Sequence, residues 1–142
     1  MISLIRVSHH LPDLQKTFVE IGRVLKPDGY FLLEIANSNN FKNRLLHFFK
    51  PIPKVPIEKR SPANIRRQTI AFVNHHPDAV LALLKKHGFT IEQILSVSNF
   101  RSSFLKSVLP LSLLLKLENT SQKPLANCFF GPSLFILAKK AK

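Results

Sequence analysis

The sequence has very little cysteine, and this limits the kinds of site that it can build. Cys128 is the single cysteine among 142 residues. An intramolecular disulfide requires two cysteines, and a cysteine-based zinc site requires several thiolates. The chain can therefore form neither, and its cysteine usage suits a reducing compartment. We expect a cytoplasmic protein.

Long hydrophobic runs are also missing. The N-terminus, MISLIRVSHH, reaches polar residues after a few apolar ones, so we expect no signal peptide. The most apolar stretch, Phe104 to Leu117, is interrupted by Pro110 and by two lysines, and it is too short to span a bilayer. We therefore expect no transmembrane helix.

Acidic residues are scarce as well. Eight Asp and Glu stand against 21 Lys and Arg, which gives a net charge of +13. A charge of this size favours anionic partners. A nucleic-acid module, a peripheral membrane protein and an enzyme with a basic surface all fit it, so charge alone leaves these classes open. The hydrophobic content of 45% is ordinary for one folded domain.

The N-terminal part of the chain has the pattern of strand, helix and strand. Ile2 to Val7 is apolar and β-branched, which predicts a buried strand. Asp13 stands at an N-cap position before a helix from Leu14 to Leu25, whose apolar residues recur at helical spacing. The turn that follows ends at Gly29, which readily adopts a positive φ, and Tyr30 to Ala36 is a second apolar strand. This is a βαβ unit, which predicts two parallel strands.

Regular structure resumes near Asp78. Leucine and valine residues at helical spacing predict a helix that starts there and closes at Gly88. Phe89 to Val97 then has the composition of a strand.

The C-terminal part predicts one more helical segment and one more strand. Ser103 to Leu117 is apolar with helical spacing, and Pro110 should kink or break it. After a polar loop, Cys128 to Lys139 forms the last predicted strand, with a bulge near Gly131 and Pro132. Four strands alternating with about four helices indicate an α/β fold.

The run ISLIRVSHHLPDLQKTFVEIGRVLKPDGYFLLEI at residues 2–35 resembles the fourth strand, helix and fifth strand of class I S-adenosylmethionine-dependent methyltransferases. Its distinctive parts are the two histidines before an Asp-capped helix and the segment RVLKPDG. The later segment HPDAVLALLKKHGFTIEQI resembles the helix and sixth strand of that family, and GPSLFILAKK resembles its seventh strand. The resemblance covers most of the chain as one partial domain, residues 1–142, and excludes roughly residues 41–68 and 101–127.

The resemblance implies the C-terminal half of a Rossmann-like fold. Its sheet would place the strands at Ile2, Tyr30, Phe89 and Phe129 side by side, with the last strand antiparallel and inserted between its neighbours. Ligands of open α/β sheets bind beyond the carboxyl ends of the parallel strands. Residues just after Val7 and Ala36 should therefore line the site.

The same resemblance implies S-adenosylmethionine as cofactor, held by a glycine-rich loop after the first strand of the family. This chain has four isolated glycines, from which such a loop cannot be built. We therefore expect a truncated, split or mis-started product that lacks an N-terminal cofactor-binding half. Such a chain should be inactive alone, and its first strand should have an unpaired edge.

The loop after the first strand carries the candidate cofactor and catalytic residues. The resemblance places cofactor contacts at Arg6, Val7 and Ser8, and a neutral histidine at His9 or His10 could act as general base. The alternative is that the two histidines only cap and shape this loop.

Polar residues at the end of the second strand are candidates for binding the substrate. They are Glu34, Asn37, Ser38 and Asn40. The alternative is a plain Asn-rich turn. No metal site is predicted, because His75 and His76 are adjacent and no cysteine or carboxylate cluster accompanies them.

Residues 41–68 form a proline-containing insertion or lid that is strongly basic. Its one acidic residue, Glu58, opposes eight cationic residues: Lys42, Arg44, Lys50, Lys54, Lys59, Arg60, Arg66 and Arg67. A short amphipathic helix is predicted at Phe41 to Phe49 within it. The segment could cover a hydrophobic substrate, lie on an anionic membrane or contact nucleic-acid phosphate, although no nucleic-acid-binding motif accompanies it. Residues 101–127, an apolar helical insertion before the last strand, permit the same alternatives.

These observations predict methyl transfer from S-adenosylmethionine to a small, lipophilic acceptor, with the protein mainly positioning two substrates. The alternative is a non-catalytic basic module that binds a partner chain, an anionic membrane or nucleic acid. The discriminating feature is whether a strand and a glycine-rich loop are encoded upstream.

Overall fold

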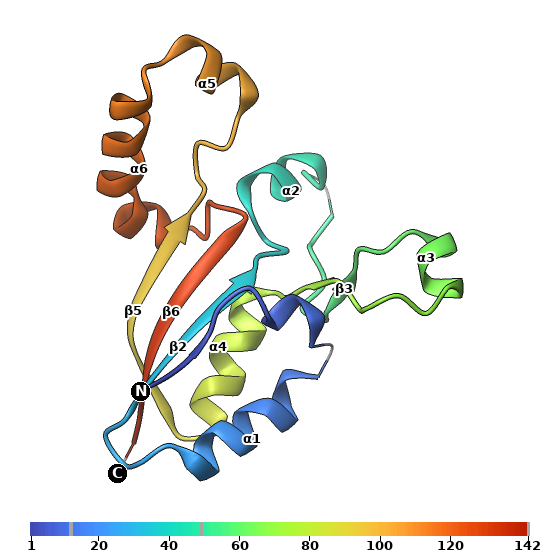
Figure 1. Ribbon diagram of the computed structural model, residues 1–142, viewed down its shortest axis with the longest axis vertical. Helices are drawn as coiled ribbons and strands as arrows, with labels where there is room; N and C mark the ends of the chain where they lie inside the picture. Colours follow the sequence, from blue (N-terminus) through green and yellow to red (C-terminus); the bar gives the residue numbers. More distant parts are fainter. Residues whose placement is uncertain (12, 49, 142) are drawn as a thin grey trace.

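The computed structural model describes residues 1–11, 13–48 and 50–141. Its main sheet has the strand order β1 (Ile2–Leu4), β2 (Tyr30–Ala36), β6 (Ser133–Lys140) and β5 (Phe89–Val97). β1 and β2 are parallel, and β6 is antiparallel to both β2 and β5 (Figure 1). The predicted α/β fold is confirmed, including an antiparallel last strand between its neighbours.

One face of this sheet is covered by α1 (Leu14–Val24) and α4 (Pro77–Lys86), which lie side by side (Figure 1). The side chain of Asp13 accepts a 2.9 Å hydrogen bond from Gln15 N, as expected of an N-cap. Alternate residues of the strands point into the core, because the side-chain period of a strand is two. The core comprises Leu14, Phe18, Ile21, Leu25, Phe31, Leu33, Ile35, Val80, Leu84, Phe89, Leu134, Ile136 and Ala138.

The turn before β2 differs from the expected one. The residue with positive φ is Asp28, at 61°, and Gly29 is required for another reason. A Cβ at Gly29 would lie 2.8 Å from both the Lys26 carbonyl oxygen and a side-chain carbon of Leu25. The glycine therefore permits a close approach of the turn to the end of α1.

The first strand is shorter than predicted, because it ends at Leu4 and not at Val7. Arg6 has a φ of 58°, in the left-handed region, and its N–H bonds to the side chain of Glu34 instead of to the backbone of β2. Strand geometry cannot continue through such a residue. β1 pairs with β2 alone among the described strands and forms the edge of the sheet, as predicted.

The segment before β6 contains two helices, α5 (Ser103–Val108) and α6 (Leu111–Ala126). They separate at Leu109, which is extended because a residue before proline is pushed out of the helical region. The predicted break at Pro110 is confirmed, but the polar loop expected after Leu117 is wrong. The helix continues to Ala126 and packs against β5. The carboxylate of Glu118 accepts hydrogen bonds from the backbone N–H groups of Asn99 and Phe100, which fastens α6 to the loop after β5.

The last strand starts at Ser133, and the bulge predicted at Gly131 and Pro132 is absent from its pairing. The register shift lies instead in β5, between Ile91 and Gln93. Gly131 is needed because a Cβ there would lie 2.5 Å from the carbonyl oxygen of Val97.

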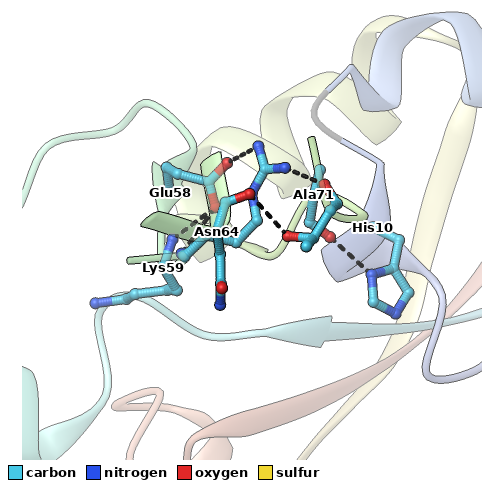
Figure 2. Close-up of polar contacts among 7 residues, drawn as sticks. His10, Glu58, Lys59, Asn64 and Ala71 are labelled. Atoms are coloured by element: carbon cyan, nitrogen blue, oxygen red, sulfur yellow. Dashed lines mark hydrogen bonds and ion pairs between the residues drawn. The ribbon is translucent and has the colours of Figure 1, made fainter. Parts of the chain in front are cut away.

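The insertion is longer than the predicted residues 41–68, and from here on the name covers residues 41–76, up to the start of α4. It contains α2 (Phe41–Leu46), α3 (Pro62–Arg66) and a small two-stranded sheet of β3 (Ile57–Glu58) and β4 (Val73–Asn74). α2 is shorter than the predicted helix, whose final residue, Phe49, lies outside the described residues. Side-chain bonds close the insertion on itself (Figure 2). Arg60 forms a 2.7 Å ion pair with Glu58, which lowers the pKa of that carboxyl group to about 2, and also donates to the Thr69 carbonyl. Within the described residues, no helix combines the length and hydrophobicity needed to cross a membrane.

Candidate functional site

A cavity of about 530 Å³ lies at the carboxyl ends of the parallel strands, where the family resemblance predicts the site. We call it the edge cavity. It is lined by the loop after β1, the end of β2, the loop after β5, the start of β6 and two residues of the insertion. These residues are Arg6, Ser8, His9, Glu34, Ala36, Asn40, Phe72, Asn74, Ser98, Arg101, Pro132 and Ser133. Its volume is within the range of small-molecule pockets.

Two of the lining residues have strained backbone. Arg6 follows β1 with a φ of 58°, and Ser98 follows β5 with a φ of 63°. Left-handed conformations of non-glycine residues cost free energy and concentrate at functional sites. Both stand at the ends of parallel strands, so the strain coincides with the rim of the edge cavity.

Glu34 is the fixed acidic group of the edge cavity. Its Oε2 accepts a 2.9 Å hydrogen bond from the Arg6 backbone N, and its Oε1 accepts a 2.6 Å bond from the Ser133 hydroxyl. These bonds hold the half-buried carboxylate in one orientation.

The three residues predicted to contact the cofactor have different surroundings. Arg6 and Ser8 line the edge cavity, whereas Val7 is 40% exposed and is not part of its lining. Ser8 is buried, and its hydroxyl donates a 2.6 Å bond to the Glu34 carbonyl. Its own carbonyl accepts a 3.0 Å bond from Nε2 of His75, so Ser8 acts as a tie between β1, β2 and the insertion.

His9 lines the edge cavity, and its pKa lies below the ordinary value. Burial is the largest cause, and the nearby His10, Arg6 and His75 lower it further, while Glu34 acts in the opposite direction. The His9 ring packs against Phe72 at a centroid distance of 4.8 Å. A histidine in these surroundings is neutral at pH 7 and can accept a proton.

His10 has a different partner. Its Nδ1 donates a 2.7 Å hydrogen bond to the Ala71 carbonyl, which ties the loop after β1 to the insertion (Figure 2). His10 is not among the residues that line the edge cavity. Of the two predicted bases, His9 is the one in the cavity.

The Asn-rich segment after β2 likewise contains both residues that are buried within the protein and a residue that lines the edge cavity. Asn37 is fully buried, and its amide donates to the carbonyls of Phe129 and Gly131 at 2.8 and 2.7 Å. Ser38 is also fully buried, and its hydroxyl has no partner among the described residues. Asn40 accepts from Asn43 N as the N-cap of α2 and lines the edge cavity.

Seven lining residues were not among the predicted site residues. They are Ala36, Phe72, Asn74, Ser98, Arg101, Pro132 and Ser133. Ser98 and Arg101 come just after a predicted parallel strand, so the strand-end rule, applied there, could have found them. Phe72 and Asn74 depend on how the insertion folds back, for which no local pattern exists.

No metal centre is evident in residues 1–11, 13–48 and 50–141, because no three His, Cys, Asp or Glu side chains gather there. His75 and His76 are both buried, and burial lowers the pKa of each.

Residues 1–33 match the sequence model of a methyltransferase domain. A comparison with curated protein sequences gives no significant match.

Several solved structures share the fold of the chain. An S-adenosylmethionine-dependent methyltransferase from Mesorhizobium loti has 13% identity and a TM-score of 0.51, with 97% of this chain and 59% of that chain covered. One from Methanosarcina mazei has 19% identity and a TM-score of 0.51, with 98% and 57% covered. A Listeria monocytogenes protein proposed to have the same activity has 14% identity and a TM-score of 0.55, with 99% and 60% covered.

The mixed sheet with its flanking helices thus defines a Rossmann-like α/β fold. The resemblance to class I S-adenosylmethionine-dependent methyltransferases is confirmed, by sequence at residues 1–33 and by fold over nearly the whole chain. The chain spans 57 to 60% of the length of these solved structures.

Proposed function

We propose that this chain forms the acceptor-binding half of an S-adenosylmethionine-dependent methyltransferase that acts in the cytoplasm on a small molecule. The observation that supports this most directly is the edge cavity, because it lies at the strand ends of the half-domain whose first 33 residues match the methyltransferase model. Its lining combines one carboxylate, a neutral histidine and several amide and hydroxyl groups. Such a set can orient a polar acceptor by hydrogen bonds.

The residues of the chain fit one wall of a cofactor site. S-adenosylmethionine, when bound, supplies a methyl group on a positively charged sulfur. Arg6 and Ser8 would form the cofactor side of the cavity, while Glu34 and Asn40 would orient the acceptor. His9 would take the proton that an O–H or N–H acceptor loses, because its ring is neutral and lies in the cavity.

The opposite wall of the cofactor site requires a glycine-rich segment, which the four isolated glycines of this chain do not supply. We propose that it comes from an N-terminal half, encoded in frame ahead of Met1 or as a separate chain. β1 offers an unpaired edge for that half. The chain alone would then bind the cofactor weakly and be inactive.

The test is calorimetric titration with S-adenosylhomocysteine of this chain and of a form extended by the sequence encoded ahead of Met1. We expect the extended form to bind at least 100-fold more tightly. Equal binding by both forms would contradict the role of the missing wall. Binding by neither would contradict the methyltransferase proposal itself.

A second candidate function is attachment to an anionic membrane, which the exposed apolar residues of the two insertions favour. Leu45 and Leu46 on α2 are 62% and 71% exposed, and Phe104 and Leu111 near α5 and α6 are both 71% exposed. Basic residues accompany them, as in helices that lie on membrane surfaces. Co-sedimentation with phosphatidylcholine vesicles, with and without phosphatidylserine, tests this at 0.15 M salt, a condition chosen to screen weak charge effects. Binding to a DNA or RNA fragment but not to vesicles would favour the nucleic-acid alternative.

A further inference from the structure

Two further cavities adjoin the edge cavity. The first, of about 560 Å³, lies between α2, the residue before α5 and the segment just before β6, and we call it the basic cavity. The second, of about 530 Å³, lies between the loop after β5 and the helices α5 and α6, and we call it the apolar groove. Ser98 and Arg101 line all three. The three spaces therefore meet at these two residues.

The basic cavity has cations and no acid in its lining. Lys42 and Lys59 from the insertion and Arg101 from the loop after β5 line it. None of these three side chains forms an ion pair or a hydrogen bond within the part of the chain that the structure describes. Three unpaired cations around one cavity favour an anionic ligand group.

The apolar groove has a different character. Leu109, Leu111, Leu114 and Leu115 line it, and Leu111 and Leu115 are 71% and 60% exposed. Glu118, its one acid, accepts hydrogen bonds from the N–H groups of Asn99 and Phe100. The groove therefore offers aliphatic surface, and its acid already has partners.

We propose that the methyl acceptor is an amphipathic anion, with its carboxylate or phosphate group bound by Arg101 and its apolar part seated in the apolar groove. This rests on the proposed function and deepens it. The position of Arg101 carries the argument, since a group bound there is next to the groove on one side and to His9 and Glu34 in the edge cavity on another. Lys42 and Lys59 add positive charge around the anionic group. The protein thereby selects molecules that have both an apolar part and an anion.

Calorimetric titration of the full chain with decanoate, decanol, decylamine and acetate at 0.15 M NaCl tests this selection. We expect decanoate to bind at least tenfold more tightly than the other three. Decanol, decylamine or acetate binding as tightly as decanoate would overturn the proposal, because the site would then not require both features. Binding to phosphatidylserine vesicles without binding to monomeric decanoate would overturn it in favour of the membrane alternative.

Two pairs of matched variants locate the site. Arg101→Gln should weaken decanoate binding at least tenfold and leave decanol binding unchanged, whereas Arg66→Gln, an exposed arginine of α3, should change neither. Leu115→Ser should weaken both ligands, whereas Leu45→Ser, an equally exposed leucine of α2, should not. An Arg101→Gln variant that binds decanoate like Arg66→Gln would overturn the assignment. These titrations need no cofactor, so their failure is distinguishable from failure of the S-adenosylhomocysteine test.

Discussion

The backbone N–H of Arg6 donates a 2.9 Å hydrogen bond to Oε2 of Glu34, which joins the loop after β1 to the carboxyl end of β2. Glu34 Oε1 accepts a second bond, from Ser133 at the start of β6. One carboxylate therefore fixes three segments that line the edge cavity. The left-handed conformation of Arg6 presents its N–H to the Glu34 side chain instead of to the backbone of β2.

Replacing Glu34 should destabilise the protein. Glu34→Ala leaves the Arg6 N–H and the Ser133 hydroxyl without their acceptor, which should cost about 1–3 kcal/mol of unfolding free energy. Urea denaturation measures this, with Glu92→Ala, an exposed carboxylate of β5, as the control. Equal midpoints for the two variants would show that Glu34 does not fasten the strand ends.

His9 should titrate below the ordinary histidine pKa, because burial disfavours its charged form. Phe72→Ala removes the ring that packs on His9 and should raise its pKa toward the ordinary value. NMR titration of the imidazole resonances measures both, with the protein in urea as reference. A native His9 that titrates at or above its value in urea would contradict its role as a neutral base.

Stability should fall between pH 7 and pH 5. Burial lowers the folded-state pKa of His75, although hydrogen bonds to the carbonyls of Ser8 and Leu11 oppose this. The unfolded state then binds more protons below its own pKa of about 6.5, so stability present above that pH is lost as pH falls toward the folded pKa. Urea denaturation at pH 7.5 and 5.5 should show a smaller pH effect for His75→Gln than for the parent. His47→Gln, at an exposed position, is the control and should keep the parent's pH effect.

Two glycines should respond in opposite directions to alanine. A Cβ at Gly131 would lie 2.5 Å from the Val97 carbonyl oxygen, so Gly131→Ala should destabilise by about 1–3 kcal/mol. A Cβ at Gly22, inside α1, would meet its nearest atom at 4.0 Å, so Gly22→Ala should stabilise by about 0.5–1 kcal/mol. Thermal unfolding of both variants measures the difference. A tolerated Gly131→Ala would mean that β6 starts farther from β5 than the structure places it.

The sheet could be predicted from the sequence because its strands and helices carry strong local patterns. The apolar run at β2 and the Asp13 cap of α1 are local signals, and the resemblance supplied the strand order. The end of β1 could not be predicted, because it depends on a hydrogen bond from the Arg6 N–H to Glu34, which is 28 residues away in the sequence. The length of α6 was missed for a similar reason. The residues from Glu118 onward have the composition of a loop, and the contact of Glu118 with Asn99 and Phe100 cannot be seen in the sequence.

The candidate site could be predicted in part. The strand-end rule located Arg6, Ser8, His9 and Glu34, which the structure brings together in the edge cavity. The rule does not distinguish a residue that faces a ligand from one that bonds within the protein. Asn37 and His10 lie in the same strand-end segments as the lining residues, but their side chains bond to carbonyls of distant residues.

The central claim is that the edge cavity forms one wall of a site for S-adenosylmethionine and its acceptor. Hydrogen–deuterium exchange tests it most directly, on the extended form of the protein that is expected to bind S-adenosylhomocysteine, with and without that ligand. Within this chain, we expect protection at residues 5–10, 34–40 and 97–101, the segments that line the edge cavity. Protection confined to Asp13, Gln15 and the start of α4, which line a separate cavity of about 290 Å³ with His76, would contradict the claim. Binding without protection of any of the three segments would contradict it equally.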